Sequence, residues 1–155
     1  MRGERTLLGF DFGEKRIGIA VGQELTASSS PLATIHATAG VPDWTTIAEY
    51  IDEWHPDGLV VGIPFNMDGS EHTMTQRARS FARQLEEHYV LPVFTVDERL
   101  SSIEAERMLI NSGKKSRSHK HKKQLVDQIA AQLILDTYFS QNGGPHNNKM
   151  AEFSD

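Results

Sequence analysis

Cysteine is absent from this chain of 155 residues. Its absence excludes disulfide bonds, thiolate metal sites and a cysteine nucleophile, and it agrees with a reducing cytoplasm. Apolar runs of membrane-spanning length are also missing, and the polar segment from Met1 to Thr6 does not resemble a signal peptide. We therefore expect a cytoplasmic protein with no membrane partner.

An overall excess of positive charge is lacking too, because the formal net charge is −5. This balance argues against a protein that coats nucleic acid without specificity. The cations are nevertheless concentrated, since residues 114–123 read KKSRSHKHKK and contain no acid. Such a segment either binds the phosphates of a polymer or merely increases solubility, and both interpretations stay open.

The hydrophobic content of 38% suffices for one core in a chain of this length. We expect a single domain over residues 1–140. Residues 141–155 contain Gly-Gly-Pro and lack apolar periodicity. We expect this tail to be disordered.

Alternating and helical hydrophobic patterns predict an α/β fold in the order β-β-β-α-β-α-β-α. Antiparallel strands followed by strand–helix alternation imply one mixed five-stranded sheet with helices on both faces. Strands are predicted over 6–12, 16–21, 32–36, 58–63 and 93–96, and helices over 43–54, 73–89, 101–111 and 122–140. The second strand alternates bulky residues with Gly18, Ala20 and Gly22, so its small face would accept a closely packed helix.

Three carboxylates occupy positions where acids are unusual. Asp11 ends the first apolar strand, Glu98 follows the last strand, and Asp127 lies on the helix face that carries Ala130, Ala131, Ile134 and Tyr138. Burying an ionised carboxylate is costly unless a cation or several donors compensate it. A divalent metal is the simplest way to bring three acids together. Asp136 falls on the opposite side of that helix and is expected to be an ordinary exposed acid.

Each acid also has a simpler interpretation. Asp11 could be a turn residue, and Asp97, Glu98 and Arg99 could form a solvated loop. Asp127 could interact with the N-terminus of its helix. We favour the ligand interpretation for Asp11, Glu98 and Asp127, and we leave open whether Asp97 joins them.

Four motifs in order resemble the YqgF/RuvX family, the Holliday-junction-resolvase-like group of the RNase H-like superfamily. They are GFDFGEKRIGIAVG at 9–22, VVGIPFNMDG at 60–69, VDERLSSIEAERML at 96–109 and KKQLVDQIAAQLIL at 122–135. The resemblance spans about residues 7–139. It implies an RNase H-like fold and a bacterial nuclease with two-metal chemistry, in which Asp11, Glu98 and Asp127 are the catalytic metal ligands.

The family is also described as nucleases for the precursor of 16S ribosomal RNA. We therefore expect a phosphodiester hydrolase that uses Mg²⁺ or Mn²⁺, processes the 5′ end of that RNA in ribosome biogenesis, and meets ribosomal precursor particles. The predicted contacts to nucleic acid, structured RNA or branched DNA, are Lys15, Arg16, Arg99, Lys114, Lys115, Arg117, Lys120, Lys122 and Lys123.

Three rival functions remain at this stage. The same site could resolve four-way DNA junctions, or the fold could serve a non-catalytic RNA-binding or ribosome assembly factor. Asp-Phe-Gly followed by Ile-Gly-Ile-Ala is also similar to the phosphate-binding hairpin of actin-like ATPases and sugar kinases. Those proteins place a nucleotide between two such domains, and this chain has room for one.

Overall fold

The computed structural model describes residues 5–98 and 119–142. The predicted helix over 101–111 and most of the predicted tail lie outside these residues. The same holds for several predicted nucleic-acid contacts, either entirely (Arg99, Lys114, Lys115, Arg117) or for their side chains (Lys120, Lys122, Lys123). In the part of the chain that is described, no helix combines the length and apolar character needed to cross a membrane.

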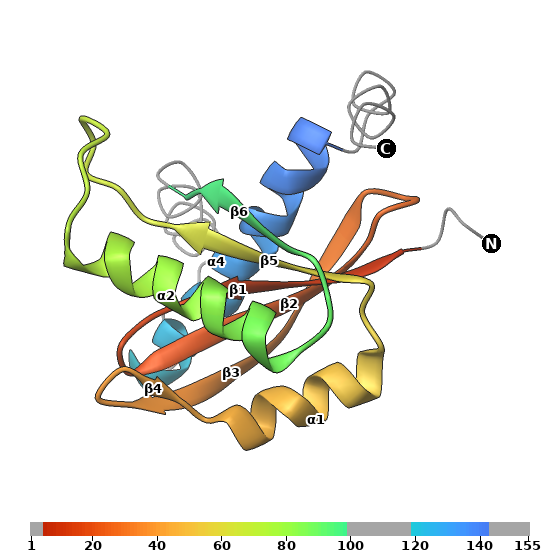
Figure 1. The fold of residues 1–155 in the computed structure, drawn as a ribbon, viewed down its shortest axis with the longest axis horizontal. Coiled ribbons are helices and arrows are strands. Elements are labelled where there is room, and N and C mark those ends of the chain that lie inside the picture. The colour runs from red at the N-terminus through yellow and green to blue at the C-terminus, as the bar shows by residue number, and fades with distance from the viewer. Residues whose placement is uncertain (1–4, 99–118, 143–155) are drawn as a thin grey trace.

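The centre of the protein is a mixed sheet of six strands in the order β4-β3-β2-β1-β5-β6 (Figure 1). Neighbours from β4 to β1 are antiparallel, whereas β1, β5 and β6 run parallel. The strands are β1 (Thr6–Asp11), β2 (Arg16–Gln23), β3 (Ser28–Thr38), β4 (Val41–Pro42), β5 (Gly58–Ile63) and β6 (Val93–Asp97). The α/β class and the mixed sheet are confirmed. The predicted strand number was too low by β4, which is too short to show a hydrophobic period.

Helices cover both faces of the sheet, as predicted. The helices α1 (Trp44–Trp54) and α2 (Thr73–His88) lie on the near face in Figure 1, and α4 (His119–Asn142) crosses behind it. Alternate side chains of each strand therefore enter different cores. Leu8 and Phe10 of β1 pack in the cluster that contains Phe81 of α2, whereas Leu7 packs with Leu135 of α4.

The third strand is longer than its sequence predicts. We expected a turn at residues 28–31, but Ser28 to Ser30 pair with β2 and the turn lies at 24–27. Pro31 is accommodated because the β2–β3 register shifts at Ile19 and Ala20, and because proline is tolerated at bulges and sheet edges. The predicted turn was wrong because local composition favoured it while tertiary pairing opposed it.

Glycines on one face of the sheet allow α4 to approach the strands closely. A Cβ atom at Gly18 of β2 would lie 2.0 Å from the backbone oxygen of Asp127, and one at Gly62 of β5 would lie 2.3 Å from Ile134. Larger residues at these positions would push the helix outward. The predicted small face of the second strand and its closely packed helix are thus confirmed, and this packing fixes the height of Asp127 above the sheet.

Candidate active site

The three predicted acids lie on the same face of the sheet. In β1 the residues that face α4 are Leu7, Gly9 and Asp11, since a Cβ at Gly9 would contact Leu135 and Leu7 lies in the α4 core. Glu98 follows β6, and its backbone N–H donates to the carbonyl of Ile63 at 3.1 Å. That bond continues the β5–β6 ladder by one residue and turns the Glu98 side chain toward α4.

Glu98 is deeply buried. Its side chain is only 6% exposed, and its Oε1 lies 3.1 Å from the Cβ that Gly62 would carry. The alternative interpretation, a solvated loop acid, is therefore wrong for Glu98, because the chain continues along β5 instead of leaving the sheet. Asp97, the last residue of β6, is half-buried.

Asp11 and Glu98 form a hydrogen-bonded pair of carboxyl groups. Burial raises the pKa of Asp11 well above its ordinary value, the charge of Glu98 and the hydrogen bond to it act in the same direction, and Arg16 opposes them. Burial also raises the pKa of Glu98, while the hydrogen bond from Asp11 and the nearby His72 lower it. Two acids in this position resist simultaneous ionisation.

Asp127 lines one pocket together with Asp11, but unlike Asp11 it is paired with a cation. Its Oδ2 accepts a hydrogen bond from Nε of Arg16 at 2.6 Å, and the two side chains are 16% and 31% exposed. The pocket between them has a volume of about 270 Å³, and we call it the carboxylate pocket. It is lined by Asp11, Gly13, Glu14, Lys15, Arg16 and Asp127.

Within residues 5–98 and 119–142, no three His, Cys, Asp or Glu side chains are arranged to hold a metal ion. The donor set nevertheless fits one. Oε1 of Glu98 is a buried oxygen with no hydrogen-bond partner among the described atoms, and a bound cation would offset the repulsion from Glu98 that helps to raise the pKa of Asp11. Carboxylate oxygens without nitrogen or sulfur ligands suit Mg²⁺ and Mn²⁺.

The helix around Asp127 agrees with most of the sequence analysis. Ala130, Ala131, Ile134 and Tyr138 are all buried, as their spacing predicts. The helix begins at His119, so Asp127 lies beyond the first turn, where the helix dipole has little effect. The prediction for Asp136 was wrong, because this acid is half-buried and accepts a hydrogen bond from Ser29 of β3 at 2.6 Å.

Two further residues near the site, Arg16 and His72, have roles that the sequence did not predict. Arg16 was expected to contact nucleic acid, and here it holds Asp127. His72 caps the N-terminus of α2 by accepting from the backbone of Met74, and its proximity lowers the pKa of Glu98. Thr75, three residues after His72, completes a capping box in the structure, but His and Thr at this spacing do not match the usual Ser/Thr and Glu/Gln signature of such a box.

Comparison with known proteins finds similar chains over nearly the whole described length of this one. The family model described as "RuvX: Holliday junction resolvase" matches residues 5–141. A Shewanella oneidensis protein is 47% identical over 140 residues, covering 90% of this chain and 97% of its own length. A protein from Legionella pneumophila strain Paris is 51% identical over 135 residues, with coverage of 87% and 95%. Both carry the name "Putative pre-16S rRNA nuclease".

Solved structures show the same fold at lower identity. The RuvC protein of Thermus thermophilus, in complex with a Holliday junction substrate, superposes with a TM-score of 0.53 at 16% identity, covering 90% of this chain and 96% of that one. The yeast mitochondrial Holliday junction resolvase Ydc2 gives 0.50 at 10% identity, with coverage of 97% and 85%. The predicted RNase H-like fold is thereby confirmed.

Proposed function

We propose, on the premise that this chain belongs to the RuvX family, that it is a nuclease for precursor 16S ribosomal RNA. The observation that carries the proposal is the pairing of half-buried Asp11 with buried Glu98 at the ends of two strands, with Asp127 lining the same pocket as Asp11. Buried acids that compete for one proton are expensive to maintain, and they cluster where proteins bind metals or perform catalysis.

Asp11, Glu98 and Asp127 would together hold two Mg²⁺ or Mn²⁺ ions. Asp11, at the end of a central strand, is the proposed shared ligand, and Glu98 and Asp127 would each hold one ion. When bound, the ions would activate a water molecule and stabilise the charge on the phosphate and the leaving oxygen. Binding and orienting the substrate would be left to the side chains of the protein itself.

Arg16 could pair with either of two anions, the carboxylate of Asp127 or a phosphate of the substrate. Without a cation in the pocket it neutralises Asp127. If Asp127 held a metal ion, the Arg16 guanidinium at the wall of the same pocket would be available to pair with a substrate phosphate. Lys15 is exposed beside it and would bind the phosphate on the outer side of the pocket.

Glu98 is buried beside Gly62, whereas Lys15 is exposed on the lining of the carboxylate pocket. An approaching substrate would therefore meet Lys15 before it met Glu98. A charged group in such a low-dielectric position interacts more strongly than in water. The arrangement can thus act on phosphodiesters with a small number of fixed groups.

Cleavage of precursor 16S RNA in the presence of Mn²⁺, with a four-way DNA junction as the parallel substrate, tests the proposal. Asp11→Asn should abolish cleavage of the RNA while the thermal unfolding midpoint stays at least as high as in the wild type. Asp52→Asn is the matched control, because Asp52 is an exposed acid on α1, across the sheet from the site. Asp52→Asn should retain full activity.

Three results would contradict the proposal. Unchanged cleavage by Asp11→Asn would remove this acid from the site. Cleavage of the junction but not of the RNA would make the protein a DNA resolvase. No metal-dependent cleavage of either substrate by the wild type would favour a non-catalytic assembly factor.

A further inference from the structure

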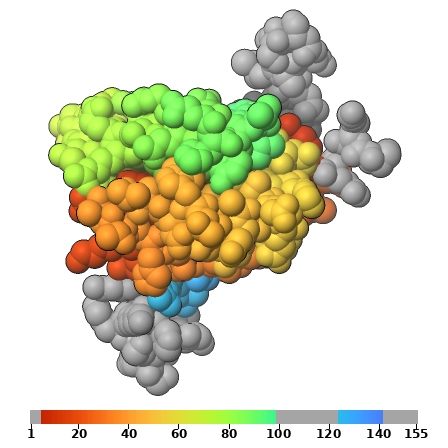
Figure 2. Space-filling view, turned by 60° about the horizontal axis from the view of Figure 1, so that its bottom comes forward, coloured from red at the N-terminus to blue at the C-terminus, as the bar shows by residue number. Residues whose placement is uncertain are grey.

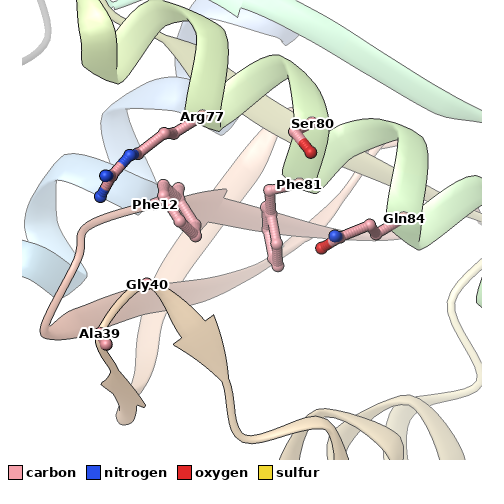
Figure 3. A pocket seen from close by; sticks show the side chains of 7 residues that line it. All are labelled: Phe12, Ala39, Gly40, Arg77, Ser80, Phe81 and Gln84. Carbon is pink, nitrogen blue, oxygen red and sulfur yellow. The ribbon is translucent and has the colours of Figure 1, made fainter.

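A second cavity lies on the opposite face of the sheet from the carboxylate pocket, between α2 and the loop that joins β3 to β4. Its volume is about 150 Å³, and we call it the α2 pocket. Figure 3 shows the rings of Phe12 and Phe81 inside it, with Ser80 and Gln84 reaching down from α2 and Gly40 opposite them. It is lined by Phe12, Ala39, Gly40, Arg77, Ser80, Phe81 and Gln84.

The walls of the α2 pocket are well defined. Arg77, Ser80, Phe81 and Gln84 follow helical spacing and so form one face of α2. The opposite wall is a tight turn in which Ala39 and Gly40 have φ of +52° and +83°. In Figure 2 the green surface of α2 adjoins the orange surface of β3, β4 and the start of α1 on this side of the molecule.

The two pockets are linked through the β1–β2 turn. Glu14 in that turn lines the carboxylate pocket, and it also forms an ion pair with Arg77 of the α2 pocket. The carbonyl of Glu14 accepts a hydrogen bond from the backbone of Gly40 at 3.2 Å. Asp11 and Phe12 are consecutive residues that face different pockets. A flexible polymer that passes over this turn would contact both pockets.

The lining of the α2 pocket favours an uncharged ligand. The charge of Arg77 is offset by Glu14, so the pocket lacks the surplus cation that a phosphate would need. Ser80 and Gln84 are neutral groups that both donate and accept hydrogen bonds. The inner surface is the Phe12–Phe81 pair, whose ring centroids are 5.1 Å apart.

The volume of the α2 pocket further limits the kind of ligand that it can hold. A cavity of about 150 Å³ is known to hold a single six-membered aromatic ring. A pyrimidine base is such a ring, is uncharged, and carries donors and acceptors along one edge. Phe12 and Phe81 are 7% and 1% exposed, so they offer an apolar floor and not a broad stacking platform. A larger purine would protrude from the pocket.

We propose that the α2 pocket binds an unpaired pyrimidine base of the RNA substrate, while the phosphodiester backbone of the same strand passes over the β1–β2 turn into the carboxylate pocket. This inference rests on the proposed function for the identity of the polymer. It assigns to Gln84 and Ser80 the recognition of the base edge, and it makes the protein selective for single-stranded pyrimidines near the cut.

Binding of short single-stranded RNAs to the full-length wild-type protein tests the inference. The probes are fluorescent oligouridylate, oligoadenylate and a strand of equal length with abasic nucleotides, measured by anisotropy in EDTA so that no strand is cut. Oligouridylate should bind about tenfold more tightly than the abasic strand, as expected for one base recognised through hydrogen bonds. Gln84→Ala and Ser80→Ala should each remove most of that difference and leave the affinity for the abasic strand unchanged.

Gln76→Ala is the matched control, because Gln76 lies exposed on the same helix outside the pocket and bonds Glu71. It should behave as the wild type does. Equal affinity of the wild type for all three probes would overturn the inference, and so would an equal loss on the abasic strand in Gln84→Ala. Because these measurements do not involve cleavage, they would stand even if the protein proved unable to cut RNA.

Discussion

Substitution of Gly18 by alanine should separate α4 from the sheet at the point where Asp127 is held. The new Cβ would lie 2.0 Å from the backbone oxygen of Asp127, and real Cβ atoms essentially never come within 3.0 Å of such a neighbour. The obstacle is helix backbone, which cannot rotate away as a side chain can. The helix must therefore move outward by about 1 Å, which is large for a closely packed interior.

Gly18→Ala should reduce the stability of the protein modestly and its activity strongly. Overpacking costs about 1–3 kcal/mol, and loss of glycine freedom in the unfolded chain offsets up to about 1 kcal/mol of it. Urea unfolding should therefore show Gly18→Ala to be about 1–2 kcal/mol less stable than the wild type. A misplacement of about 1 Å at a catalytic group can reduce the rate about 100-fold. We expect such a loss in Mn²⁺-dependent cleavage by the folded variant.

Gly22→Ala is the control for this prediction. Gly22 lies on the same strand and the same face, but its Cβ would meet the ring of Phe139 and the carbonyl oxygen of Ser28, each at 3.0 Å and both far from Asp127. These neighbours need to yield by only a few tenths of an ångström, so we expect a smaller loss of stability and nearly full activity. Wild-type stability and activity in Gly18→Ala would refute the claim that this glycine positions Asp127.

Two other predictions concern the charges of the site. Because the pKa of Asp11 is raised in the folded protein, the folded state binds more protons than the unfolded state once the pH exceeds the ordinary aspartate pKa of about 3.9. Without metal, the free energy of unfolding should thus fall as the pH rises toward the raised pKa of Asp11. Urea titrations with EDTA should show a smaller fall for Asp11→Asn. An equally steep fall in the variant would exclude Asp11 as its source. Arg16→Gln should bind Mn²⁺ about tenfold more tightly in calorimetry, because it removes the internal cation that competes for Asp127. Lys15→Gln removes a neighbouring charge without that pairing, so an equal gain in Lys15→Gln would show that only net charge matters.

Much of the fold was predictable because local patterns and tertiary structure agree along most of the chain. The alternation of Ile17, Ile19 and Val21 with small residues indicated both β2 and the close approach of a helix. The start of β3 was not predictable in this way. Serine and proline favour turns locally, and here Ser29 is held in the sheet by contacts with α4, including its bond to Asp136.

The sequence predicted which acids form the candidate site, but it did not predict that Asp127 pairs with Arg16. Asp11 and Glu98 come together because β1 and β6 run parallel on either side of β5, so their carboxyl ends meet at the same edge of the sheet. The partner of Asp127 depends on a contact between Arg16 and a helix 111 residues away, which no local pattern reports. The role of all three acids as metal ligands stays a prediction. The α2 pocket also escaped notice, since it combines one helix face with a turn whose backbone conformation is not visible in composition.

The carboxylate pocket is closed by the last described helix, although it is built around the first strand. A ribosome synthesises the chain from its N-terminus, so a nascent polypeptide carries Asp11 long before Asp127 has been translated. Docking of α4 onto the glycine face is what completes the set of acids. A partly made chain that still lacks α4 would therefore hold an unfinished site, and the activity proposed above would require that α4 has been translated and has docked.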